Sequence, residues 1–435
     1  MPNKTYMSVC IIFKLMEASM FRYTMPKFFL LLLLIWTPTS NALSMRSLIC
    51  NKTTAGLVVL GGLLFYFHQA SCEPKKVLND GFQNFENKLD GELKIVTANI
   101  NLMPKDLDIT TSGNADERAL QIADALLKQH PNTDVYFLQE MYDEQASVKL
   151  TKKMQESGFD YYAGPTKEQL EKYWSEKKYS FSSKVAGNSG EAIFVRRDSG
   201  LKVESYDVLA FCEYGVEGIG VLETYVPKGV IHVKLSSNAS NEGKKSISIF
   251  GYHLQAEIGL FGLSYFVQGQ WSKLPKTIFS DIIHVQPFQM LREKFPNYLE
   301  EIRKSQIQAA KKWIDDLQQQ GKIANHRVYI GDFNLIAGSQ EYKNLLKELR
   351  VVPATDRTDL VTIGNQANTT WSRFARPLYR FACKYVNNYG WMDLVLVDAT
   401  LKNKVKSVRV VGLKNLLGQS VTDHESVSMI LENVF

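Results

Sequence analysis

Five short polar stretches, spread over more than 300 residues, constrain the fold of this chain more than any other feature. Four of the five lie at the end of a run of residues that is typical of a β-strand. A sheet delivers strand ends to one edge, where side chains that are distant in the sequence can meet. The stretches are Asn99, Glu140, His253, Gly331-Asp332-Phe333-Asn334 and Thr422-Asp423-His424. We therefore expect one site that is assembled from all five.

Strand-like and helix-like segments alternate through the rest of the chain without an internal repeat. Helical spacing predicts a helix over Ala115–Gln129 and a longer one over Tyr298–Gln320, whose apolar stripe includes Ala309 and Trp313. The predicted strands cover Leu93–Ile100, Asp134–Leu138, Glu191–Val195, Gly229–Leu235, Ser246–His253, His326–Ile330, Met392–Val397, Val405–Val411 and Glu425–Leu431. Many strands with few helices between them favour an α/β fold of two packed sheets covered by helices over a simple doubly wound sheet.

The composition is that of a folded protein with a substantial core, since 45% of the 435 residues are apolar. Lysine and arginine number 51 against 45 aspartates and glutamates, which fits an ordinary solvated surface better than a surface that binds nucleic acid. Only Cys212 and Cys383 of the five cysteines follow the first polar stretch, and no Cys-x-x-Cys pair indicates zinc. Cys212 and Cys383 can form a disulfide in an oxidising compartment, but the sequence does not decide whether they do.

The first 75 residues are predicted to be one or two hydrophobic targeting segments. Met25-Pro26-Lys27 precedes nine apolar residues, a length that suits a secretory signal and is too short for a bilayer span. A second apolar run ends near Cys72 and resembles a lipoprotein signal, although Gln69 stands where an aliphatic residue is usual. A buried helix or an interfacial anchor is the alternative for either run. We expect a secreted or membrane-associated protein whose catalytic domain covers residues 84–435.

Asn99 lies at the end of one predicted strand, Glu140 follows the next, and both are expected metal ligands. Mg²⁺ prefers oxygen ligands and is commonly held by only one or two protein side chains. Taken singly, such an asparagine is usually a turn residue and such a glutamate is usually solvated. Because both occur with one predicted helix between them, a magnesium site is favoured. Asp423 is included among the predicted metal ligands.

The acids and imidazoles that remain suit the hydrolysis of a phosphate ester. After the strand that ends at Gly331, Asp332 can orient a water molecule and the amide of Asn334 can hold a phosphoryl oxygen; a plain Gly-Asp turn is the alternative. One imidazole of the pair His253 and His424 can take a proton from water. The other can stabilise the developing charge or protonate the leaving oxygen. Asp393 is the expected partner that fixes the tautomer of His424.

The order of these residues resembles that of the endonuclease/exonuclease/phosphatase (DNase I-like) superfamily, from residue 92 to the C-terminus. Three segments are similar to neutral and secreted bacterial sphingomyelinases: Thr97–Pro104, Tyr252–Ala256 and Val421–His424. The resemblance implies a four-layer α/β sandwich of two mixed sheets flanked by helices. It also implies Mg²⁺ at Glu140 with Asn99, His424 as general base, and His253, Asp332 and Asn334 around the phosphate.

Two further residues and one insertion are linked to the substrate. Lys228, in a Lys-Gly segment similar to one in the neutral sphingomyelinases, and Asn188, near an Asn-Gly position of the family, are substrate-binding candidates. The insertion over residues 258–296 is unusually apolar, with Phe261, Phe266 and Trp271 near its start. Aromatic residues favour membrane interfaces, so we expect docking on lipid; packing as a lid on its own domain is the alternative.

These observations favour a phosphodiesterase that hydrolyses sphingomyelin to ceramide and phosphocholine at a membrane surface. A secreted nuclease or a phosphoinositide phosphatase on the same scaffold is the alternative within enzymes. A catalytically inactive, membrane-associated binding protein is the alternative of another class. Because the chain lacks a dense basic groove, nucleic acid is not an expected partner.

Overall fold

The computed structural model describes parts of the unit Pro74–Phe435, one of two units into which the chain divides. The described residues are 91–103, 115–176, 188–211, 227–237, 245–255, 298–357, 362, 392–417, 420–422 and 424–435. The targeting segment over 1–75, the Cys212–Cys383 pair and the insertion over 258–296 lie outside these ranges and stay predictions. Within the ranges, no helix has both the length and the apolar character needed to cross a membrane.

The first sheet has six strands in the order β11-β12-β1-β2-β4-β3. Its strands are β1 (Leu93–Leu102), β2 (Val135–Met141), β3 (Phe159–Ala163), β4 (Ala192–Arg196), β11 (Val405–Val411) and β12 (Ser426–Leu431). Only β1 and β2 are parallel neighbours in it; the other neighbours are antiparallel. Strand β1, in the middle of the sheet, is buried along its whole length.

The second sheet also has six strands, in the order β5-β6-β7-β8-β10-β9. Its strands are β5 (Leu201–Ala210), β6 (Gly229–Ser237), β7 (Ser246–His253), β8 (His326–Asp332), β9 (Val352–Pro353) and β10 (Asp393–Val397). Again one central pair, β7 and β8, is parallel, and the other neighbours are antiparallel. Both sheets are therefore mixed, and each has its one parallel pair near its centre.

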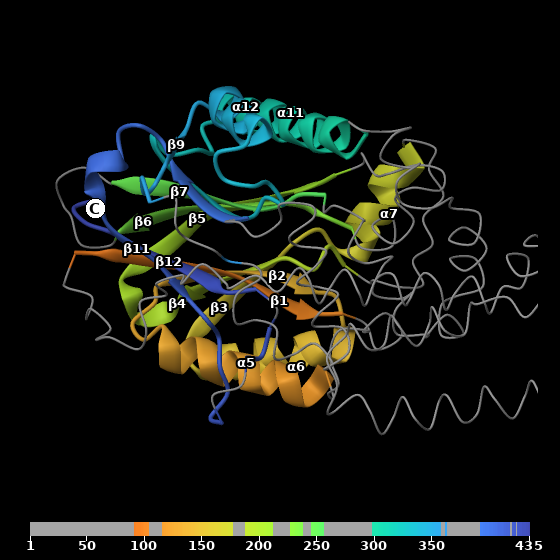
Figure 1. Cartoon of the computed structure of the whole chain (residues 1–435), viewed down its shortest axis with the longest axis vertical. Helices are drawn as coiled ribbons and strands as arrows, with labels where there is room; N and C mark the ends of the chain where they lie inside the picture. Colours follow the sequence, from red (N-terminus) through yellow and green to blue (C-terminus); the bar gives the residue numbers. More distant parts are fainter. Residues whose placement is uncertain are drawn as a thin grey trace, which may run out of the picture. The chain divides into compact units, whose positions relative to one another are not determined.

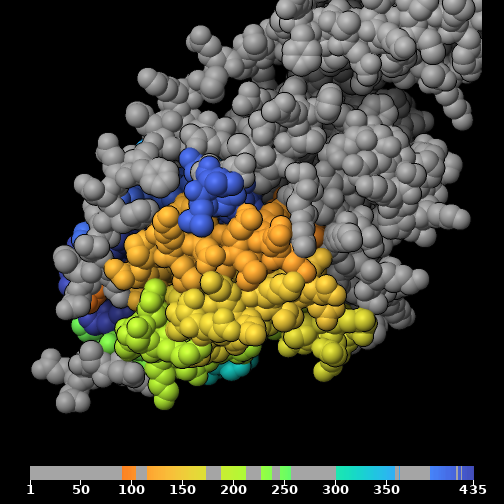
Figure 2. All heavy atoms as spheres, turned by 90° about the horizontal axis from the view of Figure 1, so that it is seen from below, coloured from red at the N-terminus to blue at the C-terminus, as the bar shows by residue number. Residues whose placement is uncertain are grey.

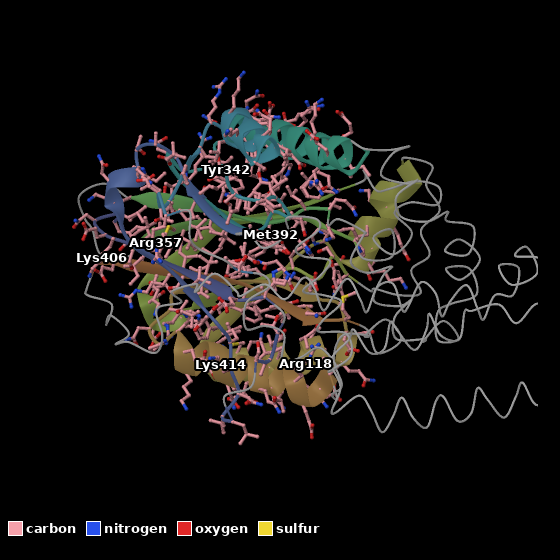
Figure 3. All side chains as sticks on the ribbon, in the orientation of Figure 1. Arg118, Tyr342, Arg357, Met392, Lys406 and Lys414 are labelled. Atoms are coloured by element: carbon pink, nitrogen blue, oxygen red, sulfur yellow. The ribbon has the colours of Figure 1, made fainter. Side chains whose placement is uncertain are left out.

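The two sheets pack face to face, and helices cover their outer faces (Figure 1). Helices α5 (Ala115–Gln129) and α6 (Glu144–Glu156) lie on the first sheet, and α11 (Tyr298–Gln319) and α12 (Gln340–Leu349) lie on the second. Side chains fill the space between the sheets, and Tyr342 of α12 extends the same hydrophobic cluster on the outer side of the second sheet (Figure 3). The four-layer α/β sandwich is confirmed.

The outer face of the first sheet is closed by a continuous band of side chains from α5 and α6 (Figure 2). The segment that joins β11 to β12 lies against the edge of this band, where Gln129 Nε2 donates to the Lys414 carbonyl at 2.6 Å. Helix α6 begins at an N-cap, since the Asp143 carboxylate accepts from Ala146 N at 2.8 Å. Three short elements complete the described fold: α7 (Lys167–Glu176) and the 3₁₀ turns Arg197–Ser199 and Lys402–Lys404.

The structure differs from the sequence predictions in two respects. Ile302 and Leu317 of the predicted apolar stripe of α11 are buried, whereas Ala309 and Trp313 are only half-buried, because in the middle of the helix the buried face carries their neighbours Ala310 and Ile314. Elements α6, α7, α12, β3, β5 and β9 were not predicted. Most residues of β5 are only partly buried, so this edge strand lacks the apolar run that marks a central strand.

Candidate active site

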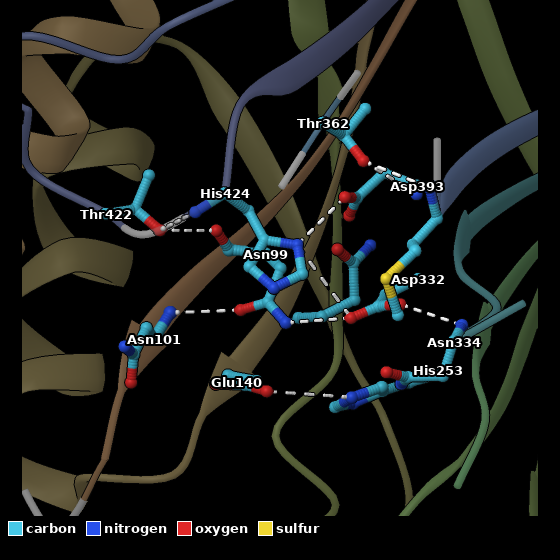
Figure 4. A network of polar contacts seen from close by, with 12 residues as sticks. Asn99, Asn101, Glu140, His253, Asp332, Asn334, Thr362, Asp393, Thr422 and His424 are labelled. Atoms are coloured by element: carbon cyan, nitrogen blue, oxygen red, sulfur yellow. Dashed lines mark hydrogen bonds and ion pairs between the residues drawn. The ribbon is translucent and has the colours of Figure 1, made fainter. Parts of the chain in front are cut away.

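The two central parallel pairs bring their carboxyl ends to the same edge of the sandwich. Within the first sheet, Asn99 of β1 pairs with Gln139, which precedes Glu140. Within the second sheet, His253 at the end of β7 pairs with Asp332 at the end of β8, and Asp393 at the start of β10 pairs with the same Asp332. Across the sheets, Asn99 Nδ2 donates to Asp332 Oδ2 at 3.0 Å, so the two edges meet (Figure 4).

Backbone irregularities turn three of these strand ends toward the site. Glu140, Asn101 and Asn334 have φ values of 62°, 47° and 50°, in the left-handed region that non-glycine residues enter at a cost of about 1–2 kcal/mol each. We expected Asn99 at the end of its strand and Glu140 after the end of its strand, but both strands continue past these residues. The reason is that a register shift after Asn99 and the left-handed Glu140 change the direction of the side chains without ending the strands.

Gly331, one residue before Asp332, occupies a backbone position that only glycine fits. Its φ is 133°, and a Cβ atom there would lie 2.0 Å from the Tyr252 carbonyl oxygen of β7. The close approach of β8 to β7 therefore requires glycine. Beyond it, Asp332 Oδ1 accepts from Asn334 N at 2.9 Å, which holds the carboxylate in place.

His424 lies between two carboxylates. Its Nδ1 is 2.8 Å from Asp393 Oδ2 and 4.0 Å from Asp332 Oδ2 (Figure 4). Thr422 Oγ1 donates to the Asn99 carbonyl at 2.7 Å and accepts from His424 N at 3.3 Å, which ties the segment before β12 to β1. Burial raises the pKa of the Asp393 carboxyl, and the His424 imidazole opposes this by favouring the ionised form.

His253 is fully buried on the other side of Asp332. Its Nε2 is 3.0 Å from Lys228 Nζ and 3.8 Å from Glu140 Oε1, and its Nδ1 is 4.0 Å from Glu191 Oε1. Burial, then Lys228, then His424 lower the pKa of His253 well below its ordinary value, so the imidazole is neutral near pH 7. Because an ammonium group only donates, Nε2 accepts from Lys228.

The sequence reasoning missed Glu191 as a candidate and did not consider Thr362. Glu191 is 3% exposed, and its Oε1 accepts from Gly229 N at 2.8 Å. Burial raises its pKa to about 8, so the side chain is mostly protonated near pH 7. The sequence signal that could have identified Glu191 is an acidic residue directly before an apolar strand, β4.

Thr362 Oγ1 accepts from the backbone N–H groups of Met392 and Asp393, both at 3.1 Å, and belongs to a segment without strand or helix signal.

Among the residues that the structure describes, two clusters of side chains have donor atoms close enough to hold a metal ion. They are Glu140 with His253 and Asp332, and Asp332 with Asp393 and His424, with the ligand atoms of each cluster within 4.8 Å of one another. In the first cluster, Asp332 Oδ2 also accepts a hydrogen bond from Asn99 Nδ2. Two carboxylates and one imidazole make up this cluster, and carboxylate oxygens are the donors that Mg²⁺ prefers. The Asn99 amide turns its nitrogen toward Asp332, and its Oδ1 accepts from Asn101 N at 3.1 Å. The residues present therefore fit a divalent cation on the Glu140 side.

The remaining predicted site residues have different outcomes. Lys228 is brought into the site, 1% exposed, and donates to His253 and to the Leu254 carbonyl at 3.1 Å. Asn188 uses its Oδ1 to accept from Gly190 N at 2.8 Å, and a role in binding substrate stays a prediction. Asp423 lies outside the described residues.

The site as a whole combines the His424 imidazole oriented by Asp393, the buried Lys228 ammonium, and the carboxylates of Glu140 and Asp332. This combination suits general-base attack of water on a phosphate ester.

Solved structures with this fold support the assignment of the architecture. SmcL has a TM-score of 0.52 at 18% identity, covering 79% of this chain and 100% of that one. Beta toxin 275-280 from Staphylococcus aureus has a TM-score of 0.50 at 19% identity, covering 78% and 99%. At these identities the likeness concerns the fold.

A comparison with curated proteins finds no match. The sequence profile of the Endonuclease/Exonuclease/phosphatase family, in contrast, matches residues 96–424, a range that covers more than half of the chain and contains every strand end described above. This protein belongs to the Endonuclease/Exonuclease/phosphatase family.

Proposed function

We propose that this protein is a Mg²⁺-dependent phosphodiesterase that hydrolyses sphingomyelin to ceramide and phosphocholine at a membrane surface. Members of its family are hydrolases that act on phosphodiester bonds. The observation that carries the proposal is the contact between His424 Nδ1 and Asp393 Oδ2 at 2.8 Å, next to Asp332. A buried carboxylate on one ring nitrogen is the arrangement that prepares an imidazole to act as a base.

His424 is the proposed general base. With its Nδ1–H donated to Asp393, Nε2 is the basic nitrogen of the ring. It takes a proton from a water molecule while the oxygen of that water attacks phosphorus, and Asp332 orients the water. The bond between phosphorus and the ceramide oxygen breaks, the leaving oxygen takes a proton from solvent water, and His424 releases to solvent the proton that it took from the attacking water. Phosphocholine and ceramide are the products.

Asn334, Lys228 and His253 are the proposed contacts of the phosphoryl oxygens. Asn334 Nδ2 donates one hydrogen to the Leu254 carbonyl at 2.8 Å, and the amide nitrogen has a second hydrogen for the substrate. The Lys228 ammonium beside the neutral His253 supplies positive charge in a buried site, where charge stabilisation is strongest. Since the pKa of His253 is so low, we favour stabilisation of the developing charge over proton donation as its role.

Glu140 and Asn99 would hold the Mg²⁺ ion. Mg²⁺ prefers oxygen ligands, and Glu140 and Asn99 can offer a carboxylate oxygen and an amide oxygen. Glu140 lies in the same cluster as His253 and Asp332. When bound, the ion supplies charge stabilisation at the phosphate and the leaving oxygen. Asp423 is a further proposed ligand.

The lipid substrate is proposed from the sequence segments around the site and from the apolar insertion. The segments that contain Asn99, His253 and His424 are similar to those of neutral and secreted bacterial sphingomyelinases. The insertion over residues 258–296 starts directly after the strand that carries His253, so lipid contact there would bring the headgroup to the site. Export or anchoring through residues 1–75 would place the enzyme at a membrane.

Product analysis tests the proposal. The purified full chain is incubated with vesicles of sphingomyelin, phosphatidylcholine or a phosphoinositide, and with DNA, each with Mg²⁺ and with EDTA. We expect release of phosphocholine from sphingomyelin alone, and its loss with EDTA. His424→Ala should lower the rate by at least about 10³-fold, because the general base and its carboxylate partner act as a unit.

His326→Ala is the matched control, since His326 lies at the opposite end of β8 from Asp332. Its rate should stay within about twofold of the unchanged protein. DNA cleavage that requires His424 would replace the lipid substrate by nucleic acid. Equal rates for His424→Ala and the unchanged protein would refute the site itself.

A further inference from the structure

We propose that Gln306 and Arg303 of α11 are positioning residues that clamp the segment after β7 and thereby set the geometry of the phosphate contacts. Each residue contacts the backbone of Gln255, through which it acts on the site. The inference rests on the proposed function, because it assigns these residues to the same site.

The Leu254 peptide is the element that the clamp must hold. Its N–H donates to the Asp332 carbonyl at 3.0 Å. Its carbonyl accepts from Lys228 Nζ at 3.1 Å and from Asn334 Nδ2 at 2.8 Å. One carbonyl therefore orients two of the three proposed phosphate contacts, and a shift of that carbonyl would move both.

Both sides of the next residue, Gln255, are held by α11. Gln255 N donates to Gln306 Oε1 at 3.0 Å, and the Gln255 carbonyl accepts from Arg303 Nη1 at 3.3 Å. Gln255 and Gln306 are fully buried, and Arg303 is 3% exposed. Because the helix binds the N–H and the carbonyl together, the chain after Leu254 has little freedom to rotate.

A second helix fixes Arg303 in turn. Its Nε and Nη2 donate to the two carboxylate oxygens of Glu341 at 2.6 and 2.9 Å, a bidentate pair. Glu341 lies in the first turn of α12, whose N-cap is Ser339. A negative charge is stabilised at that end of a helix. The clamp thus runs from α12 through Arg303 to the segment that carries His253.

Packing alone does not explain these polar residues. The rest of the buried face of α11 is apolar, with Ile302, Ile307 and Ala310 on it. A buried glutamine or guanidinium group is costly unless hydrogen bonds compensate it, and an apolar residue of similar volume would pack as well. The polar pair occurs where the helix passes the chain that leaves the site, which fits a positioning role.

Gln306→Leu removes the acceptor for Gln255 N and tests the clamp. Misplacement of a binding group by about 1 Å can lower a rate by about 10²-fold. With bis(p-nitrophenyl) phosphate as a soluble diester, we expect kcat to fall by about 10–100-fold while KM changes by less than about threefold. Gln306→Glu keeps an oxygen acceptor and should restore most of kcat. Gln308→Leu, at an exposed position of the same helix, is the control and should not change kcat.

A double-mutant cycle separates positioning from general stability. Asn334→Ala removes one group through which the clamp acts, so Gln306→Leu should cost at least several-fold less in the Asn334→Ala background. Hydrogen exchange of the peptide that contains residues 246–255 should increase in Gln306→Leu at temperatures well below its Tm. Should that variant not fold, Arg303→Lys keeps the charge, loses the bidentate pair, and carries the same expectation for kcat and for the cycle.

The outcomes distinguish the two proposals. If Asn334→Ala lowers kcat but the α11 variants do not, or if their effects add fully to that of Asn334→Ala, the clamp is refuted and the site stands. If neither Asn334→Ala nor His424→Ala lowers the rate, the proposed function fails. In that case, increased hydrogen exchange in Gln306→Leu would still show that α11 holds the segment, while unchanged exchange would overturn the clamp as well.

Discussion

Glu191→Gln tests whether burial of the Glu191 carboxyl makes the stability of the protein depend on pH. Burial raises the pKa of this carboxyl from 4.5 to about 8, against the opposing effects of Ser189, Gly229 N and Lys228. At a pH between these two pKa values, the Glu191 carboxyl has lost its proton in the unfolded chain and keeps it in the folded protein. The folded state then binds more protons, so the contribution of Glu191 to stability falls as pH rises from about 4.5 to about 8 and is constant above that.

The size of the effect follows from the two pKa values. At 1.36 kcal/mol per pH unit, the difference corresponds to an upper limit of about 5 kcal/mol above pH 8. Relaxation and water penetration reduce such values, and we expect about 2–5 kcal/mol. Glutamine keeps an oxygen that can accept from Gly229 N but carries no titratable proton. Glu191→Gln therefore removes the fall in stability that the carboxyl causes as pH rises. The variant should therefore be more stable than the unchanged protein at pH 9, with a difference of less than about 1 kcal/mol at pH 5.

Urea unfolding at pH 5, 7 and 9 measures this difference, with the variant and the unchanged protein side by side. Glu156→Gln is the control, because the Glu156 side chain is 61% exposed, and its curve should follow the unchanged protein at every pH. An equal stability difference between Glu191→Gln and the unchanged protein at pH 5 and pH 9, within about 1 kcal/mol, would show that the carboxyl does not titrate as its burial implies. The reasoning would then be refuted.

Three further changes test the geometry of the site. Asp393→Asn should lower kcat on a soluble diester by about 10²–10⁴-fold with folding intact by circular dichroism, because the amide can hold the wrong tautomer of His424; an unchanged kcat would contradict the role. Gly331→Ala should cost at least about 3 kcal/mol in urea unfolding, since its Cβ would meet the Tyr252 carbonyl at 2.0 Å, whereas Gly338→Ala, with open space, should cost about 1 kcal/mol. Removal of the metal by EDTA should abolish turnover, and added Mg²⁺ should restore it; full activity in EDTA would exclude the metal.

Much of the fold was predictable because its central strands are marked locally. The predicted ranges Ser246–His253 and Ala115–Gln129 coincide with β7 and α5, and the predicted range Gly229–Leu235 lies within the central strand β6. Buried central strands need continuous apolar runs, and an amphipathic helix needs a regular period, so both leave a signal in the sequence. The half-exposed edge strand β5 has no comparable requirement and was not predicted.

The candidate site was predictable in its members and not in its contacts. Asn99, His253 and Asp332 could be named because they belong to an ordered set of polar residues at the ends of apolar strands. Glu191 could not, because its position beside His253 depends on how β4 and β7 pack. The clamp from α11 has the same character, since Gln306 is one glutamine among several on that helix until the fold places it against Gln255.

The sequence by itself determined which residues enter the central strands, which of these strands end in acids, amides and imidazoles, and hence the family of the chain. These properties depend on neighbours in the chain, where backbone conformation and apolar periodicity act. Only the tertiary structure decided that Asp332 meets Asn99 across two sheets, that burial keeps His253 neutral, and that α11 reaches the site. Such facts depend on contacts between distant segments, and desolvation exists only once those segments have packed together.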